Sequence, residues 1–388
     1  MQYSHRIQTL EESVTIAVSS LARELKAKGR DILSFSAGEP DFDTPQSVKN
    51  VAIDAINAGF TKYTAVGGIP ELKDAIIAKL KRENGLSYER SEVLVSNGAK
   101  HSLFNIGAAL IDHDDEVLIP VPFWVTYPEL VKYYGGKPVL LPTNDANAFK
   151  ITPEQLRAAL TPRTKMLILN SPSNPTGSVY SRDELAALGK VLEGTNVWVV
   201  SDEMYEKLLY EGEFCSTAFA SEDLLQRTIV VNGVSKSAAM TGWRMGYCAC
   251  KDKKLIKLMD NLQGQCTSNI NSITQKAAIA ALDGRIDSDI ESMRKEFCKR
   301  RDIVVEGIAA IKGLSVVKPS GAFYVFVNIS KIESDSVRFC KALLEKEGVA
   351  VVPGSGFGMD GYFRFSFATD LPSIMQGIER INRFVQSY

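Results

Sequence analysis

Short apolar runs alternate with longer amphipathic segments over roughly the first 280 residues of the chain. Each run is apolar at nearly every position, which is typical of strands that are buried on both faces of a parallel sheet. The predicted strands are 92–96, 116–120, 165–170, 197–201, 228–233 and 245–250. Their alternation with helical segments predicts βαβ units and an α/β fold.

Two of the intervening helices carry clear start signals. The segment 70–84 opens with Pro70, a residue that is favoured in the first turn of a helix because its missing N–H is not needed there. The segment 181–194 has the spacing of a capping box, with Ser181 three residues before Glu184. Both segments are therefore predicted to be helices.

After residue 283 the pattern changes, which predicts a second, smaller α+β domain. A long helix is expected from Ile286 to Ile311, then strands at 322–327, 349–352 and 362–368, a helix ending near Lys346 and a closing helix from about Pro372. The amphipathic segment 13–29 is expected to pack with this domain or against a partner subunit. We predict a large domain at 46–283, and a small domain formed by 1–45 and 284–388.

Charge and composition exclude some classes of partner. The 388 residues contain 45 Lys and Arg against 46 Asp and Glu, so no overall positive field attracts nucleic acid or anionic membrane. No apolar run approaches the length that crosses a bilayer, and the first residues do not resemble a signal peptide, so a cytoplasmic location is expected. Six scattered cysteines and three histidines predict reduced thiols and no metal site.

Lys236 follows an apolar strand and a short turn, where a side chain projects into a crevice rather than a core. A partly desolvated lysine in such a place can act as a nucleophilic amine, although an isolated lysine is usually a solvated surface charge. Ser235 precedes it, and Arg244 lies between Gly242 and Gly246, which could turn the guanidinium back towards the lysine. The alternative is a plain turn with a surface arginine.

Two further segments suit anions and polar ligands. Gly98 stands between a strand and a helix, where free backbone N–H groups can face a phosphate. Asn174 follows a buried strand and precedes a proline, which fixes its backbone and aims its amide. Each could instead be an ordinary turn residue.

Asp202 ends an apolar strand, where a carboxylate is costly unless it caps a helix or meets a cation. Capping is one explanation. The other is a contact with a pyridine nitrogen, which the carboxylate would keep protonated so that the ring accepts electrons. Tyr205, three residues later, would present its hydroxyl on the same side.

These motifs occur together in one known family. The segments SAGEPDF, KYTAVGGIPELKDAI, SNPTG, SDEMYE, SKSAAMTGWRMGY and FRFSFA have the order and spacing of class I aminotransferases that use pyridoxal phosphate, and they resemble the bacterial-type aspartate aminotransferase subgroup most. The resemblance runs from about Arg6 to Val385. It implies fold type I, with a mostly parallel seven-stranded sheet in the large domain, and a homodimer with shared sites.

The resemblance also implies roles for individual residues. Lys236 would bind the cofactor's aldehyde and move the substrate's Cα proton, Asp202 would pair with the ring nitrogen, and Arg364 would take the substrate α-carboxylate with Gly38 nearby. The remaining cofactor contacts would be Asn174 and Tyr205 to the ring oxygen, Trp124 stacked on the ring, Gly98, Ala99, Lys100, Ser235 and Arg244 around the phosphate, and Tyr63 from a second subunit. Trp124 could otherwise be a core residue.

Specificity depends on fewer positions. In this subgroup a lysine at position 100 is associated with the distal carboxylate of aspartate or glutamate, and Ser13 and Thr15 resemble a polar pair near the same pocket. A solvated first-turn lysine is the alternative for Lys100. Members that accept prephenate carry a lysine where this chain has Glu11, so transfer from aspartate to 2-oxoglutarate is expected.

Three alternatives to this reaction stay open. The first is an aminotransferase with aromatic, prephenate or other donors, and the second is a lyase acting on a sulfur amino acid. The third is a cofactor-sensing regulator, which would need a DNA-binding segment for which the resemblance leaves no room.

Overall fold

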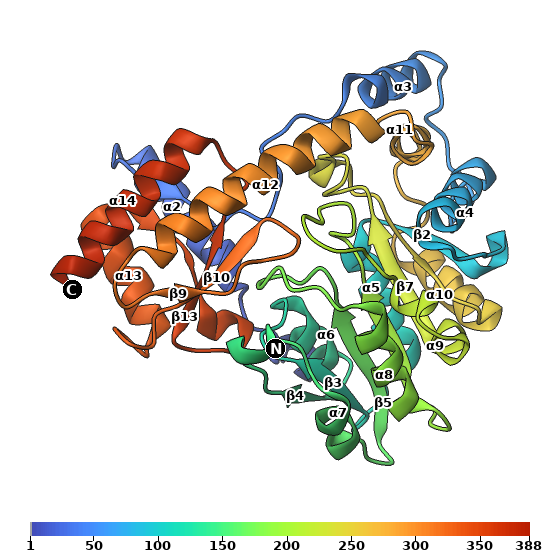
Figure 1. Cartoon of the computed structure of the whole chain (residues 1–388). Coiled ribbons are helices and arrows are strands. Elements are labelled where there is room, and N and C mark those ends of the chain that lie inside the picture. Colours follow the sequence, from blue (N-terminus) through green and yellow to red (C-terminus); the bar gives the residue numbers. More distant parts are fainter. Residues whose placement is uncertain (1) are drawn as a thin grey trace.

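The computed structural model describes residues 2–388, and within them a seven-stranded sheet forms the larger part of the molecule (Figure 1). The strand order is β2-β8-β7-β6-β5-β3-β4, and only β8 runs antiparallel to its neighbours. The strands are β2 (Val93–Ser96), β3 (Glu116–Pro120), β4 (Lys137–Leu141), β5 (Thr164–Asn170), β6 (Trp198–Asp202), β7 (Thr228–Gly233) and β8 (Gly246–Ala249). The predicted mostly parallel sheet is confirmed.

The strand β4 was not predicted from the sequence. It lies at the edge of the sheet beside β3, and most of its side chains are partly or fully exposed. Because an edge strand is not buried on both faces, it lacks the continuous apolar run by which the other six strands were found. Its second residue, Pro138, also weakens a strand pattern.

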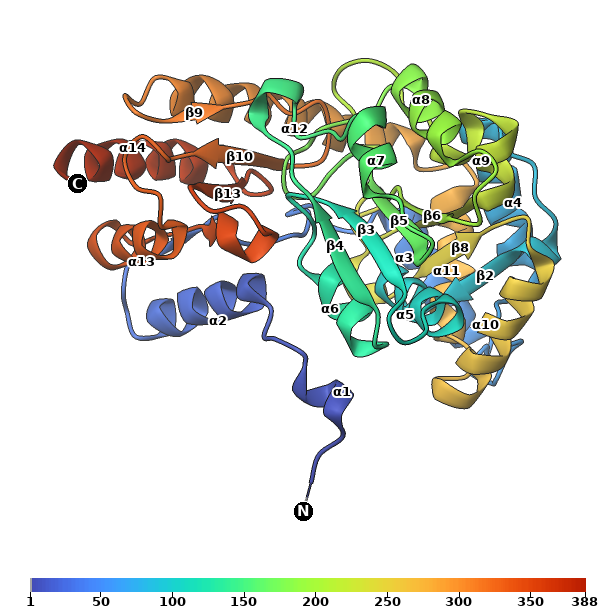
Figure 2. The same ribbon diagram turned by 90° about the horizontal axis from the view of Figure 1, so that it is seen from below.

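Helices cover both faces of this sheet (Figures 1 and 2). Alternate residues of β3 point to opposite sides, with Val117 and Ile119 in one apolar cluster and Leu118 in another. The first cluster packs under α5 (Ala99–Leu110), α6 (Thr126–Tyr133) and α10 (Lys253–Cys266), and the second under α7 (Pro153–Ala159), α8 (Arg182–Leu192) and α9 (Glu222–Arg227). A third cluster holds α3 (Gln46–Asn57), α4 (Pro70–Asn84) and α11 (Ser272–Leu282).

The carboxyl-terminal part forms a separate layer with an aromatic core. Its antiparallel sheet has the order β12-β13-β10-β9, and its helices include the long α12, which runs between the two parts (Figure 1). The elements are β9 (Ser315–Val316), β10 (Tyr324–Asn328), β11 (Val349–Ala350), β12 (Val352–Pro353), β13 (Tyr362–Ser366), α12 (Asp287–Ala309), α13 (Ser336–Glu347) and α14 (Leu371–Ser387). The predicted α+β layer is present, whereas the boundaries at 46 and 283 stay predictions.

The amino-terminal segment belongs to this second layer. Strand β1 (Leu33–Ser34) pairs in parallel with β11, and α2 (Val14–Ala27) packs through Ala22 against Leu344 of α13. Figure 2 shows α2 alongside α13, with the short α1 (His5–Gln8) further out. One of the two predicted positions of segment 13–29 is therefore confirmed.

The predicted helix starts are also found. Pro70 is the first residue of α4, and the Ser181 hydroxyl and Glu184 carboxylate form both bonds of a capping box at α8. All six cysteines are free. Within residues 2–388, no cluster of side chains has the composition of a metal site, and every helix is too short or too polar to cross a bilayer.

Candidate active site

A cavity of about 310 Å³ lies where the carboxyl ends of the parallel strands face the smaller layer. The β5, β6 and β7 strands are neighbours, and their ends supply Asn170, Asp202 and the turn that leads to Lys236. The cavity is lined by Thr15, Gly38, Ala99, Lys100, Trp124, Tyr127, Asn170, Asn174, Asp202, Met204, Tyr205, Ser235, Lys236, Arg244, Tyr324 and Arg364. Most of the residues singled out in the sequence thus lie together, although their separate roles stay predictions.

Lys236 has the environment of a reactive amine. Its Nζ donates a 2.5 Å hydrogen bond to the backbone oxygen of Gly38, and within residues 2–388 no carboxylate lies within 4.0 Å of it. Burial lowers the pKa of Lys236 to about 8, with the charges of Arg244 and Arg364 acting in the same direction and the attraction of Glu39 and Asp202 opposing it. The amine is therefore deprotonated far more readily than an ordinary lysine.

An anion cradle forms where β2 meets β8. Because these strands are antiparallel, the start of β8 lies beside the end of β2, and Arg244 reaches the amino end of α5. Gly98 has φ +82°, which residues with a side chain rarely adopt, and a Cβ there would also lie 2.4 Å from an Arg244 nitrogen. The cradle combines this guanidinium with free N–H groups of the first turn of α5, and Ser235 and Lys100 line the same cavity.

The turn at Arg244 forms differently from the sequence-based expectation. Arg244 itself adopts the left-handed conformation, at φ +56°, whereas Gly242 has no positive φ and open space around it. Gly246 is needed for a different reason, because a Cβ there would lie 2.2 Å from the backbone nitrogen of Ala99. Glycine at 246 thus lets the strand approach the helix, and the expected role of Gly242 is wrong.

Asp202 is a buried carboxylate, 5% exposed, and it does not cap a helix. It accepts hydrogen bonds from the Tyr127 hydroxyl, at 2.8 Å, and from the Met204 N–H, at 3.2 Å. Burial raises its pKa, while these hydrogen bonds oppose the shift. Within residues 2–388 no cationic atom lies within 4.0 Å of it, so its surroundings suit a protonated ring nitrogen better than a structural ion pair.

Asn174 and Tyr205 also line the cavity. The Asn174 backbone N–H donates to the Asn170 side chain at 2.7 Å, which holds its loop against the end of β5. The Tyr205 hydroxyl lies 3.0 Å from that of Tyr324. Burial raises the pKa of Tyr205 well above its ordinary value, so the hydroxyl stays protonated and can donate.

Arg364 is 1% exposed and lies on β13. Its guanidinium donates to the Asn174 side-chain oxygen at 2.9 Å and to the Ser36 backbone oxygen at 2.8 Å, and it stacks on Tyr324 at 4.4 Å from the ring centre. Its Nε has no hydrogen-bond partner, and no carboxylate within residues 2–388 pairs with it. A buried, unpaired guanidinium that faces a cavity is suited to an anionic ligand.

Lys100 lies at the mouth of the cavity, with its Nζ 4.8 Å from the ring centre of Trp124. Partial burial and the charge of Arg244 lower its pKa. Thr15 lines the same cavity, whereas Ser13 and Glu11 line an adjoining one, which Lys100 also borders. Glu11 is held there by a 2.8 Å bond from its backbone N–H to Glu129.

Some cavity residues were missed in the sequence. Tyr127 follows Trp124 by three residues, Asn170 is the polar last residue of β5, and Tyr324 lies within the apolar run of β10. Asn170 had a readable signal, since a polar residue at the carboxyl end of a parallel strand faces the ligand side. Tyr127 and Tyr324 had none, because aromatic residues in apolar segments are usually core.

Tyr63 lies apart from these residues and is 91% exposed. It does not line the cavity of its own chain. The position agrees with a side chain that reaches a second copy, which stays a prediction.

Known proteins are similar to this chain in sequence and in fold. The aminotransferase class I and II profile matches residues 30–381. The aspartate aminotransferase of Geobacillus stearothermophilus is 48% identical over 100% of both chains, and the aspartate/prephenate aminotransferase of Nitrosomonas europaea is 48% identical over 98% of this chain and 99% of that protein. The solved aspartate aminotransferase of Thermus thermophilus with maleate has a TM-score of 0.96 at 43% identity, covering 99% of this chain and 100% of the other. The chain belongs to the class I and II aminotransferase family.

Proposed function

We propose that this protein is an aspartate aminotransferase that uses pyridoxal 5′-phosphate. It transfers the amino group of L-aspartate to 2-oxoglutarate, giving oxaloacetate and L-glutamate in a ping-pong cycle. One observation carries the proposal: four cationic side chains, those of Lys100, Lys236, Arg244 and Arg364, line one cavity without carboxylate partners within residues 2–388. Such a cavity suits a ligand set with several anionic groups, namely a phosphate and a dicarboxylic amino acid.

The cofactor fits the residues that are present. When bound, pyridoxal phosphate supplies an aldehyde that combines with amines and a cationic ring that accepts electrons. Asp202 would hold the proton on the ring nitrogen, and Asn174 and Tyr205 would donate hydrogen bonds to the ring oxygen. The phosphate would take the N–H groups of α5 with Ser235 and Arg244, and Trp124 would cover one face of the ring.

The substrate contacts follow from the remaining cations. Arg364 would bind the α-carboxylate through its planar fork, next to Gly38, and Lys100 would meet the distal carboxylate. Lys236, with its pKa of about 8, would take the proton from the substrate Cα and deliver it to the cofactor. Placing the carboxylate against Arg364 fixes the direction in which the Cα–H bond points.

The proposal includes a homodimer in which Tyr63 of a second copy reaches the phosphate, and a cytoplasmic location. The exposed ring of Tyr63 supports the first. Sedimentation would test the dimer, and a Tyr63→Phe variant with weaker cofactor binding would test the contact. Cell fractionation would test the location.

Prephenate is a second candidate acceptor, because the Nitrosomonas europaea relative is named for it. Here Glu11 lies beside the cavity mouth, within 3.9 Å of Lys132. An extra carboxylate at this position disfavours a bulky dianion, so 2-oxoglutarate remains the favoured acceptor for the amino group of aspartate.

A panel of donors and acceptors tests the proposal. Purified protein with pyridoxal phosphate is given aspartate, aromatic amino acids or sulfur amino acids together with 2-oxoglutarate, and glutamate with prephenate. Aspartate with 2-oxoglutarate should give the highest kcat/KM. A higher value for an aromatic donor or for prephenate would replace the assignment, and pyruvate release from a sulfur amino acid without an acceptor would indicate a lyase.

A further inference from the structure

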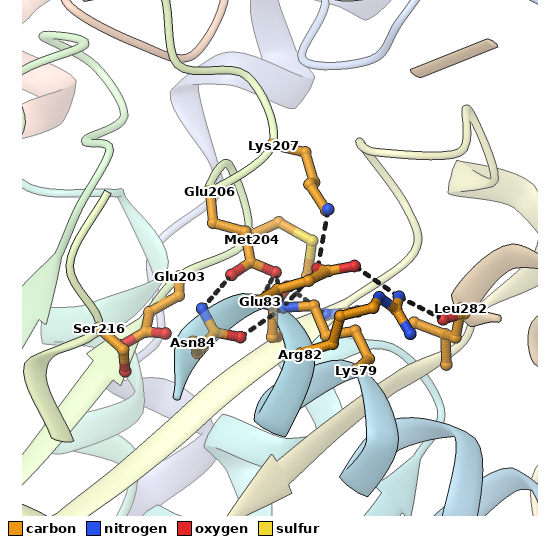
Figure 3. A network of polar contacts seen from close by, with 12 residues as sticks. Lys79, Arg82, Glu83, Asn84, Glu203, Met204, Glu206, Lys207, Ser216 and Leu282 are labelled. Atoms are coloured by element: carbon orange, nitrogen blue, oxygen red, sulfur yellow. Dashed lines mark hydrogen bonds and ion pairs between the residues drawn. The ribbon is translucent and has the colours of Figure 1, made fainter. Parts of the chain in front are cut away.

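The turn that carries Asp202 and Tyr205 has a second set of side chains that the proposed reaction does not use. Glu203 and Glu206 alternate with the cavity residues in the sequence and do not line the cavity. Both are buried. Figure 3 shows them among side chains of α4 and beside Ser216 of a neighbouring loop.

The Glu206 carboxylate is fully engaged. It forms a short ion pair with Lys79 and accepts 2.8 Å hydrogen bonds from the side-chain amides of Asn84 and Asn232. Lys79 also donates to the Asn84 oxygen at 2.9 Å. Burial lowers the pKa of Lys79, but the combined effect of Glu206, Tyr247 and Glu83 outweighs it, so the pKa is raised and the lysine stays charged.

These contacts join three separate pieces of chain. Lys79 and Asn84 belong to α4, Glu206 to the turn after β6, and Asn232 to β7, four residues before Lys236. A second acidic side chain adds a tether, since Glu203 accepts from the Ser216 hydroxyl at 2.7 Å and the Thr217 N–H at 3.1 Å. The turn is thus held by directional bonds on the side away from the cavity.

Such a network adds no more stability than apolar packing would. Two charges taken out of water lose hydration that their attraction roughly repays, so a packed apolar pair would serve stability equally well. Hydrogen bonds to several donors do fix a carboxylate in one position, which apolar contacts do not. The network is therefore suited to holding the Glu206 carboxylate, and the turn that carries it, in one position.

We propose that Glu206, paired with Lys79 and bonded to Asn84 and Asn232, is a positioning residue that fixes the Asp202–Tyr205 turn against the strand leading to Lys236. This inference rests on the proposed function for its catalytic consequence. A turn that shifts by about 1 Å would misplace Asp202 and Tyr205 relative to the cofactor, and such shifts lower turnover by about 10²-fold in other enzymes.

The double variant Lys79→Met/Glu206→Gln tests the proposal. It removes both charges, nearly keeps both volumes and leaves an amide oxygen at 206. Its control is Lys190→Met/Glu193→Gln, which removes an exposed pair at 2.8 Å near the end of α8. The readouts are kcat and aspartate KM of the cofactor-loaded protein, and hydrogen exchange of the Glu206 and Leu208 amides, which bond to Glu203 and Tyr205.

In the double variant kcat should fall by about tenfold or more with KM within about threefold, and the two amides should exchange about tenfold faster. The control should leave all three unchanged. A kcat and an exchange rate within about twofold of wild type would overturn the proposal, even if the melting temperature fell. If the double variant does not fold, Asn84→Ala is measured in the same way, and unchanged values there overturn it too.

The two proposals fail separately. A wild-type protein without aminotransferase activity would reject the proposed function. The exchange rates of the turn do not depend on activity, so they would still decide whether Glu206 fixes the turn.

Discussion

Two regions that contain buried charges meet at the turn after β6. In the cavity, Asp202 and Arg364 are both almost fully buried, and neither has an oppositely charged partner within residues 2–388. In the network outside the cavity, Lys79 and Glu206 are equally buried, and each is paired. In the first region the buried charges lack partners that a ligand could supply. In the second region the protein supplies the partners itself.

This difference separates residues of similar burial. A buried charge with a partner is satisfied by the fold, and removing one member leaves the other stranded. A buried charge without a partner carries its desolvation cost in the folded chain, so its removal relieves the fold while it harms ligand binding. Stability and activity should therefore respond in opposite ways in the two regions.

The largest effect is expected for Lys236→Ala. Turnover of aspartate with 2-oxoglutarate should fall by about 10⁴-fold or more, because both the amine that binds the cofactor and the base at Cα are lost. The thermal unfolding midpoint should not fall, since Lys236 has no ion-pair partner. Normal turnover in this variant would end the assignment of the cavity as the active site.

Two amide substitutions test whether paired and unpaired buried carboxylates contribute differently to stability. Glu206→Gln should lower the free energy of unfolding of the cofactor-free protein by about 2 kcal/mol, because buried Lys79 loses its short ion pair with Glu206 and keeps only the longer one to Glu83, at 3.5 Å. Asp202→Asn should change it by less than about 1 kcal/mol, because no cation is stranded. Urea denaturation at pH 7 measures both, and equal losses would contradict the distinction.

Arg364→Lys should lower kcat/KM by about 100-fold for every donor, because a lysine cannot hold the α-carboxylate through two parallel hydrogen bonds. The matched control is Arg300→Lys, since Arg300 is also buried but pairs with Asp41 at 2.7 Å. The control should lose stability and keep kcat/KM. A donor-selective effect of Arg364→Lys would contradict a role at the group common to all donors.

Lys100→Gln should raise the KM for aspartate about tenfold and the KM for an aromatic donor much less, because only aspartate has a distal carboxylate. Steady-state kinetics with both donors measures the ratio. An equal effect on the two donors would remove Lys100 from substrate recognition and leave it a role near the phosphate.

The smallest effect concerns pH. Burial depresses the pKa of Lys236 to about 8, below its ordinary value, so the unfolded chain binds the proton more tightly than the folded one. Between about pH 8 and 10.5 this group therefore adds stability as pH rises. Cofactor-free Lys236→Met should be more stable than wild type at pH 7, by about 1–3 kcal/mol, and this advantage should shrink as pH rises through that window. A constant difference would show that the amine is not perturbed.

Sequence patterns located much of this molecule, for reasons that differ between elements. Six strands buried on both faces were found by their unbroken apolar runs, and α4 and α8 by Pro70 and the Ser181 capping box. The edge strand β4 was missed because half of its surface is exposed. At the site, Lys236 and Asp202 stood out as charges at the ends of apolar strands and Arg364 through its motif, whereas Tyr127 and Tyr324 looked like core residues.

By itself the sequence determined which residues carry charge and which segments must be buried, and through its motifs it determined the family. Only the tertiary structure decided which charges are paired. Glu203 and Glu206 carry the same carboxyl group as Asp202 and lie within four residues of it, yet the two glutamates meet donors from α4, β7 and the loop at 216–217, and the aspartate meets none with a positive charge. The pairing of Glu206 with Lys79 joins segments 127 residues apart, and local patterns cannot specify such a contact.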